Sequence, residues 1–178
     1  MKRRQYIALA LAILTIATAL FKLSDDNPTK KDSVIYGRVA KVKDGDTVSI
    51  NPDSGGRSFT CRLYGIDTPE KSGRGVSGQP YWEQAARELE ELAGDQTVRI
   101  TLTGEKSYNR EICLIDRGGV NVNLEMVKRG YAWAYRRYLD TPYAGEYIYA
   151  EEGARGRRLG LWRQTNPEPP WEFRRRER

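Results

Sequence analysis

The chain has 178 residues, 39% of them hydrophobic and 30% charged, with a formal net charge of +6 and no histidine. This composition is that of a globular chain with room for one domain of ordinary size plus terminal segments, and it excludes a wholly disordered protein. The absence of histidine excludes Ser-His-Asp and Cys-His catalysis and imidazole metal sites. Any hydrolytic chemistry must therefore rely on carboxylates, with a hard cation such as Ca²⁺ or Mg²⁺.

The N-terminal segment, residues 1–23, has the pattern of an export signal. Three basic residues at positions 2–4 precede an uncharged apolar stretch, 5–21, and an Ala-Thr-Ala motif at 17–19. The stretch falls short of the roughly 20 residues that span a bilayer, which favours a cleaved signal peptide over an uncleaved membrane anchor. We therefore expect an exported protein, secreted or held in the periplasm or cell envelope, with residues 24–33 as a polar linker.

The region 34–163 has the pattern of one folded domain. Strand-like runs at 34–42, 47–50 and 57–66, separated by Asp-Gly and Gly-Gly turns, predict a meander. Apolar residues at helical spacing predict a helix within 79–95, and two more strands follow at 97–103 and 110–116, with a short one at 119–122. Five short strands with a helix between the third and the fourth are the element order of an OB barrel, a mainly β or α+β fold.

The rest of the chain predicts two further helices and a tail. Asn123 is expected to cap a short helix that ends at Gly130, and Thr141 and Pro142 are expected to begin a last helix. The aromatic stretch between these helices is expected to be extended or irregular. Residues 164–178 are rich in proline and arginine, which predicts a basic tail that either solubilises the chain or holds polyanions near its body.

The two cysteines, Cys61 and Cys113, lie in separate strand-like runs. Export would permit a disulfide between them, and two buried free thiols are the alternative. Because the chain has no histidine, its two cysteines provide too few of the nitrogen and sulfur ligands that a zinc site needs.

Two acidic motifs frame the third predicted strand. The first motif is KDGDTV at residues 43–48. An Asp-Gly hairpin turn explains positions 44 and 45 but does not require Asp46, which begins a strand where aspartate is disfavoured. The second motif is DTPE at residues 67–70. It would also suit the start of a helix, through Asp67, Thr68 and Glu70. Each motif alone is therefore weak evidence for a functional site.

Together the motifs meet the needs of phosphodiester cleavage, which requires a cation, guanidinium groups and a base that activates water. Asp46, Asp67 and an oxygen of Thr68 can hold the cation, and Glu70 can be the base. Arg62 can clamp the phosphate in a bidentate geometry, and Arg110 offers a second guanidinium.

The motifs DGDTV, CRLYGIDTPE, SYNR, VNLEMVKRGYAWAY and GLW occur in order from about Val34 to Trp162. In this combination the chain resembles the staphylococcal thermonuclease-like nucleases, and its PPWEFRRR segment resembles some bacterial relatives. The resemblance implies a five-stranded OB barrel with about three helices. It also implies Ca²⁺-dependent hydrolysis of DNA and RNA, with little sequence specificity and 3′-phosphate products.

The resemblance also implies roles for single residues. Ca²⁺ would be bound by Asp46, Asp67 and the carbonyl of Thr68, with Glu70 as general base and Arg62 and Arg110 as the pair that stabilises the phosphate. Tyr108, and Tyr135 or Tyr138, resemble positions that contact the nucleotide, and packing is the alternative role for these tyrosines.

The sequence departs from the family pattern around the second arginine. Asn109 stands where the family has glycine, and asparagine tolerates the positive φ that such a position would need. Ser107 stands where the family has lysine, and Glu111 is expected either to pair with Arg110 or to face solvent. None of these changes removes a predicted site residue.

The chief alternative to a nuclease is an OB-fold protein of the cell envelope that binds nucleic acid without cleaving it. The enzyme is favoured because all six predicted carboxylate, threonine and arginine positions carry the expected residue types. The sequence implies DNA and RNA as partners and no protein partner, with membrane attachment left open, and monomer is the default state.

Overall fold

The protein is described here from a computed structural model, which describes residues 33–73 and 75–177. The predicted signal peptide or anchor and all but the last residue of the predicted linker lie outside these residues. Within the two described ranges, none of the helices combines the length and apolarity that a bilayer crossing requires.

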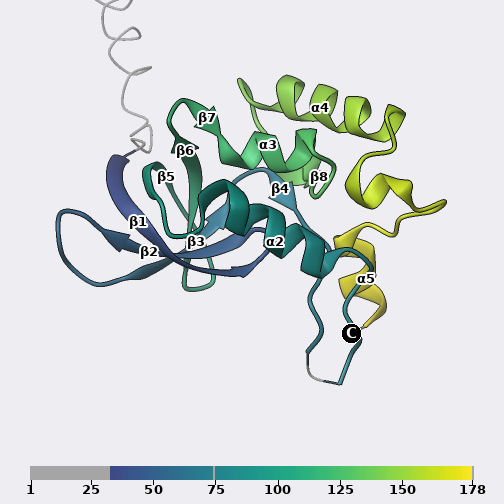
Figure 1. The fold of residues 1–178 in the computed structure, drawn as a ribbon, viewed down its shortest axis with the longest axis horizontal. Helices are drawn as coiled ribbons and strands as arrows, with labels where there is room; N and C mark the ends of the chain where they lie inside the picture. Colours follow the sequence, from purple (N-terminus) through teal and green to yellow (C-terminus); the bar gives the residue numbers. More distant parts are fainter. Residues whose placement is uncertain (1–32, 74, 178) are drawn as a thin grey trace, which may run out of the picture. The chain divides into compact units, whose positions relative to one another are not determined.

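Five strands form a closed barrel, as the sequence predicts (Figure 1). Neighbouring strands pair in the order β3-β2-β1-β5-β6, and a parallel pairing of β3 with β6 closes the ring. The strands are β1 (Ser33–Asp44), β2 (Thr47–Pro52), β3 (Phe59–Leu63), β5 (Thr97–Ser107) and β6 (Arg110–Arg117). Alternate residues point inward, and the apolar core includes Val39, Val48, Ile50, Leu63 and Ile100.

Cys61 and Cys113 lie on the two strands that close the barrel, and neither side chain is exposed. Their Cα atoms are 6.0 Å apart, a separation that suits a disulfide. Both cysteines belong to the main apolar core.

Helix α2 (Trp82–Ala93) covers one side of the barrel and packs against β1 (Figure 1). Its buried residues include Ala85, Leu89 and Leu92, which share one helix face because they are three or four positions apart. The helix ends at Gly94, as the sequence predicts.

Helix α3 (Val122–Lys128) begins earlier than the sequence predicts, so the expected cap at Asn123 is wrong. Asn121 is the cap, and its side chain accepts a hydrogen bond from the backbone N–H of Leu124 at 3.1 Å. Asn123 instead lies fully buried in the first turn. Its side chain accepts from the backbone N–H of Ile115 at 3.0 Å and donates to the carbonyls of Tyr64 and Cys113, both at 3.1 Å. It therefore joins the helix to two segments of the barrel.

Helix α4 (Ala144–Gly156) packs against α3 and begins two residues after Pro142, so the predicted start at Thr141 and Pro142 is also wrong. The predicted irregular aromatic stretch contains β8 (Trp133–Ala134) and a short 3-10 helix, η1 (Arg136–Tyr138). The strand β8 pairs with β4 (Ile66–Asp67), which continues the chain beyond β3. A two-residue strand, β7 (Val120–Asn121), pairs with β6 just before α3.

The C-terminal segment contains a further α-helix, α5 (Pro170–Arg176), where the sequence predicts a tail. Trp171 stacks on Tyr135 with ring centroids 5.3 Å apart and meets the edge of Trp133 at 5.5 Å. A second 3-10 helix, η2 (Gly160–Arg163), precedes this segment and places Trp162 against Trp133, with centroids 4.3 Å apart. The aromatic contacts explain why a proline-rich, highly charged segment packs on the domain.

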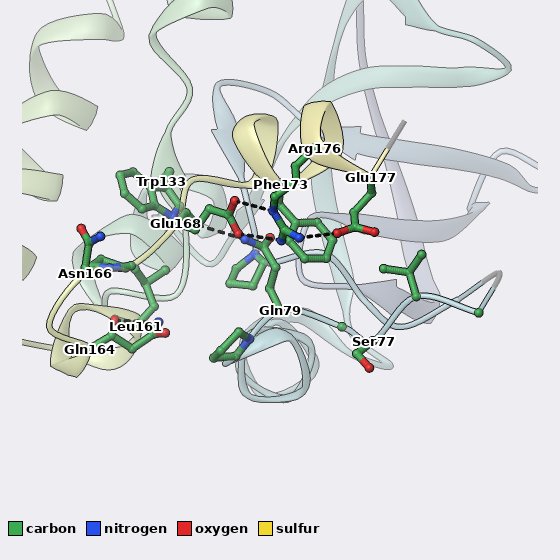
Figure 2. Close-up of a pocket in the computed structure, with 16 residues that line it drawn as sticks. Ser77, Gln79, Trp133, Leu161, Gln164, Asn166, Glu168, Phe173, Arg176 and Glu177 are labelled. Atoms are coloured by element: carbon green, nitrogen blue, oxygen red, sulfur yellow. Dashed lines mark hydrogen bonds and ion pairs between the residues drawn. The ribbon is translucent and has the colours of Figure 1, made fainter.

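Figure 2 shows how polar contacts hold the same segment. The buried side chain of Gln79 donates to the carbonyl of Glu168 at 3.0 Å, and the guanidinium of Arg176 donates to both carboxylate oxygens of Glu168. These groups border a cavity of about 520 Å³ between the loop that precedes α2 and the C-terminal segment. Helix α5 is therefore tied to the loop that follows β4.

Candidate active site

The turn between β1 and β2 brings Asp46 to the end of β3. The backbone N–H of Leu63 donates to the Asp46 carbonyl at 2.8 Å, which fixes the turn beside the following strand. Asp46 is 6% exposed, and its carboxylate accepts from the Thr68 backbone N–H at 3.2 Å and from the Thr68 hydroxyl at 3.0 Å. The two acidic motifs, 22 residues apart in sequence, thus meet directly.

Gly45 makes this contact sterically feasible. A Cβ atom at this position would lie 2.8 Å from the Ala85 Cβ of α2 and 2.8 Å from the Thr68 hydroxyl oxygen. Because real Cβ atoms do not approach other heavy atoms so closely, only glycine lets the turn fit between the helix and the site.

The guanidinium of Arg62 lies between the two buried aspartates. Its Nη2 donates to Asp67 Oδ1 at 2.8 Å, and its Nη1 forms an ion pair with Asp46. Burial alone would lower the pKa of Arg62, but the charges of Asp46 and Asp67 outweigh burial and raise that pKa above its usual range. Arg62 is therefore cationic at every physiological pH.

The pKa values of the two buried aspartates shift in opposite directions. For Asp46, burial alone would raise the carboxyl pKa, but the charge and hydrogen bond of Arg62 and further hydrogen bonds lower it below its usual range. For Asp67, which has no exposed surface, burial raises the pKa, and the Arg174 hydrogen bond and the Arg62 charge only partly oppose that rise.

Asp44 is a further acidic group at the site, which the sequence assigns only to the hairpin turn. Its carboxylate accepts from the Asp46 backbone N–H at 3.3 Å, and it lines the same cavity as the predicted residues. Burial, followed by the nearby Asp46 charge, raises the pKa of Asp44 to about 6.

Arg110 approaches the site from the start of β6. Its Nη2 donates to the Ser107 hydroxyl at 3.0 Å, and its Nη1 donates to the Thr47 hydroxyl at 3.5 Å. The expectation that Asn109 would adopt a positive φ is wrong, because Tyr108 is the residue in that turn with φ of 58°. Glu111 pairs with Lys106 at 2.7 Å and not with Arg110.

Glu70 is half-buried, and its carboxylate forms an ion pair with Arg174 of α5. The backbone N–H of Glu70 donates to the Gln79 side chain at 2.9 Å, and Gln79 also contacts the C-terminal segment. The Arg174 guanidinium further donates to both carboxylate oxygens of Asp67, at 3.1 and 2.8 Å.

Sequence reasoning missed Arg174. It lies 107 residues from Asp67, in a segment interpreted as a tail, so no local spacing could reveal the contact. The available signal was the PPWEFRRR motif, whose two aromatic residues precede a run of three arginines.

One cavity of about 440 Å³ brings the predicted residues together. Of the six predicted metal, base and arginine positions, five line it and Asp67 lies buried behind Arg62 and Arg174. The cavity is also lined by all three predicted tyrosines, Tyr108, Tyr135 and Tyr138.

The tyrosines differ in what their rings already contact. Tyr108 is 93% exposed and Tyr138 is 52% exposed. Tyr135 is half-buried, with one face stacked on Trp171 and its ring near the edge of Tyr138 at 4.9 Å. Tyr108 and Tyr138 therefore expose the most ring surface, while Tyr135 packs on Trp171 and also lines the cavity.

The donor chemistry suits a hard cation. Asp46, Asp67 and Thr68 offer oxygen atoms only, which Ca²⁺ and Mg²⁺ prefer. Across residues 33–73 and 75–177, no group of three or more aspartate, glutamate, histidine or cysteine side chains is arranged to hold a metal ion. The predicted ligands Asp46, Asp67 and Thr68 do not form a group of this kind, because they are two carboxylates and one threonine oxygen.

Comparison with known proteins gives a consistent result. The profile of a family described as staphylococcal nuclease homologue matches residues 60–164. An uncharacterized endonuclease of Haemophilus influenzae is 37% identical over 141 residues, which cover 79% of this chain and 74% of that protein. A micrococcal nuclease of Shigella flexneri is 34% identical over 175 residues, which cover 93% of this chain and 94% of that protein.

Proposed function

Because the chain belongs to the staphylococcal nuclease homologues and is a nuclease, we propose that it is an exported, Ca²⁺-dependent enzyme that hydrolyses DNA and RNA with little sequence specificity. The products would be 3′-phosphates. One observation carries this proposal: two acidic motifs, both predicted arginines and the predicted base border one cavity.

The cation would be held by Asp46, Asp67 and Thr68. When bound, Ca²⁺ supplies positive charge next to the phosphate oxygens, where negative charge grows in the transition state. Burial keeps both carboxylates away from bulk water, which strengthens their interaction with a cation. Arg62 pairs with both carboxylates and lines the cavity, so its guanidinium lies next to the proposed cation ligands.

Glu70 would act as the general base. Its carboxylate borders the cavity and is less buried than either aspartate, so it can accept a proton from a water molecule at the phosphate. The hydrogen bond from its backbone to Gln79 keeps the residue at the cavity edge.

Arg62 and Arg110 would bind the non-bridging phosphate oxygens. They enter the cavity from β3 and β6, the two strands that close the barrel. A planar guanidinium can donate two parallel hydrogen bonds to a phosphate and so stabilise the additional charge of the transition state.

The proposal is tested with purified protein and three substrates: single-stranded DNA, duplex DNA and RNA. Each is incubated in Ca²⁺, in Mg²⁺ and in EDTA, and the product ends are identified by mass spectrometry. We expect cleavage of all three substrates in Ca²⁺, no cleavage in EDTA, and 3′-phosphate ends. Cleavage that persists in EDTA would contradict the metal dependence, and binding without cleavage in all conditions would indicate a nucleic-acid-binding protein.

A further inference from the structure

A third cavity, of about 430 Å³, lies next to the active-site cavity and shares Tyr135 and Arg174 with it. Four arginines line it, together with Ala134, Tyr135 and Trp171, and no acidic residue of the described chain is among the lining groups. The arginines are Arg136 and Arg137 of η1 and Arg174 and Arg175 of α5, and we call these four residues the arginine surface.

Two of these four guanidiniums already have carboxylate partners. Arg136 pairs with the buried carboxylate of Glu151 at 2.9 Å, and Arg174 pairs with Asp67 and Glu70. Arg137 and Arg175 are exposed, and neither forms an ion pair with a carboxylate of the described residues. Two positive charges are therefore available for an external anion.

The arginine surface is continuous with the active-site cavity. Arg174 lines both cavities, and so does Tyr135. A chain of phosphates that passes from the scissile bond across Arg174 would next meet Arg175 and Arg137.

The surface is also fixed in place. Helix α5 is held by the stacking of Trp171 on Tyr135 and by the Gln79 hydrogen bond to Glu168. Arg137 lies over the ring of Tyr138, with its guanidinium carbon 5.6 Å from the ring centroid. Tyr138 is itself half exposed and lines the active-site cavity. Guanidiniums beside an exposed aromatic ring are the combination that binds single-stranded nucleic acid, through phosphates and stacked bases.

We propose that the arginine surface is a subsite for the sugar-phosphate backbone of the substrate strand beyond the scissile bond, with Arg137 and Arg175 as its phosphate contacts. The proposal rests on the proposed function, because it assumes that the phosphate to be cleaved lies in the neighbouring cavity. It assigns the C-terminal helix a role in binding long substrates.

The test compares two double variants of the full-length chain with the same change in net charge. Arg137→Gln with Arg175→Gln alters the subsite. Arg57→Gln with Arg99→Gln is the matched control, because both residues are exposed and neither lines a cavity at the site. Binding of a single-stranded DNA of about 16 nucleotides, the upper site size of an OB fold, is measured by fluorescence anisotropy in EDTA over a range of salt concentrations.

We expect the subsite variant to lower the steepness of log Kd against log salt by about 1.4, since each phosphate contact on a single strand contributes about 0.7. The control variant is expected to keep the wild-type slope. Equal slopes for the two variants would overturn the subsite. A loss seen on vesicles of anionic lipid but not on DNA would also overturn it and indicate a membrane contact.

Cleavage separates failure of the subsite from failure of the proposed function. In Ca²⁺, the subsite variant should lose more kcat/KM on a long strand than on a dinucleotide, because only the long strand reaches Arg137 and Arg175. If wild-type protein binds but does not cleave, the proposed function fails while the salt slope still decides the subsite. If wild-type protein cleaves and the loss does not depend on strand length, the subsite alone is wrong.

Discussion

At the scale of single residues, Arg110 illustrates why the shape of the cation matters. Its guanidinium contacts the hydroxyls of Ser107 and Thr47 with two different nitrogen atoms, which orients the group toward the cavity. A lysine ammonium is a point charge on a flexible chain. It cannot donate to both hydroxyls and bind a phosphate at the same time.

We therefore predict that Arg110→Lys lowers kcat/KM by about 10²-fold, similar to the loss of one preorganised donor to a transition state. The measurement is steady-state cleavage in Ca²⁺, with circular dichroism as the check that the variant folds. Full activity of Arg110→Lys would show that Arg110 is not a phosphate ligand.

Gly45 is predicted to be irreplaceable for steric reasons. Gly45→Ala should destabilise the protein by about 1–3 kcal/mol through overpacking against Ala85 and Thr68, and it should lower activity because Asp46 would move. The matched control is Gly145→Ala in helix α4, where a Cβ meets nothing within 4 Å and alanine should stabilise by about 0.5–1 kcal/mol. Chemical denaturation of both variants gives the comparison, and equal stabilities would refute the steric account.

Much of the residue-level site was predictable, and Arg174 was not. Strand alternation predicts that Arg62 points away from Cys61 and Leu63, and the structure confirms this, since both neighbours are buried in the core while Arg62 lines the cavity. The contact of Arg174 with Asp67 depends on how a distant helix packs, and local sequence patterns carry no information about that packing.

At the scale of elements, Asn123 connects α3 to the barrel. Its three hydrogen bonds satisfy one N–H and two carbonyl groups, and the residue is fully buried. Removal of its side chain would take this partner from the Ile115 N–H and the Tyr64 carbonyl, at about 1–3 kcal/mol for each orphaned group. The Cys113 carbonyl would still accept from the Tyr64 N–H at 2.8 Å.

The prediction compares two asparagines of the same helix start. Asn123→Ala should lower the free energy of unfolding by several times the roughly 1 kcal/mol expected for loss of the Asn121 cap in Asn121→Ala. Urea denaturation at one temperature measures both values. The reverse order would mean that Asn123 has no bridging role.

The elements that the sequence predicts best are those with strong periodicity. The five barrel strands and α2 appear near their predicted positions because alternation and helical spacing are properties of local sequence. Helix starts are harder to predict, because Asn121 and Asn123 both precede apolar residues and the side chain of either asparagine can cap a helix. Helix α5 escaped prediction because its stability comes from Trp171 packing on rings from another part of the chain.

At the scale of the whole molecule, the barrel is closed by strands that carry Cys61 and Cys113, 52 residues apart. We predict that exported protein contains a disulfide at this position. Mass spectrometry without reduction should show a mass lower by two hydrogens than that of the reduced chain.

The same bridge should also stabilise the fold. By the chain-entropy relation, a bridge over such a loop stabilises the fold by about 4 kcal/mol, so reduction should lower the denaturation midpoint. Two free thiols in protein collected from the exported fraction would contradict the prediction.

The central claim is that the cluster around Asp46, Arg62 and Glu70 performs hydrolysis and does not merely bind nucleic acid. The most direct test compares wild-type protein with Glu70→Gln, which keeps the shape of the side chain and removes its ability to accept a proton. Binding of single-stranded DNA in EDTA and cleavage in Ca²⁺ are measured on the same preparations. The account predicts binding no weaker than that of the wild type, since the change removes a negative charge beside Arg174, and a loss of cleavage of about 10²–10⁴-fold, the usual contribution of general-base catalysis. Cleavage by Glu70→Gln at the wild-type rate would contradict it.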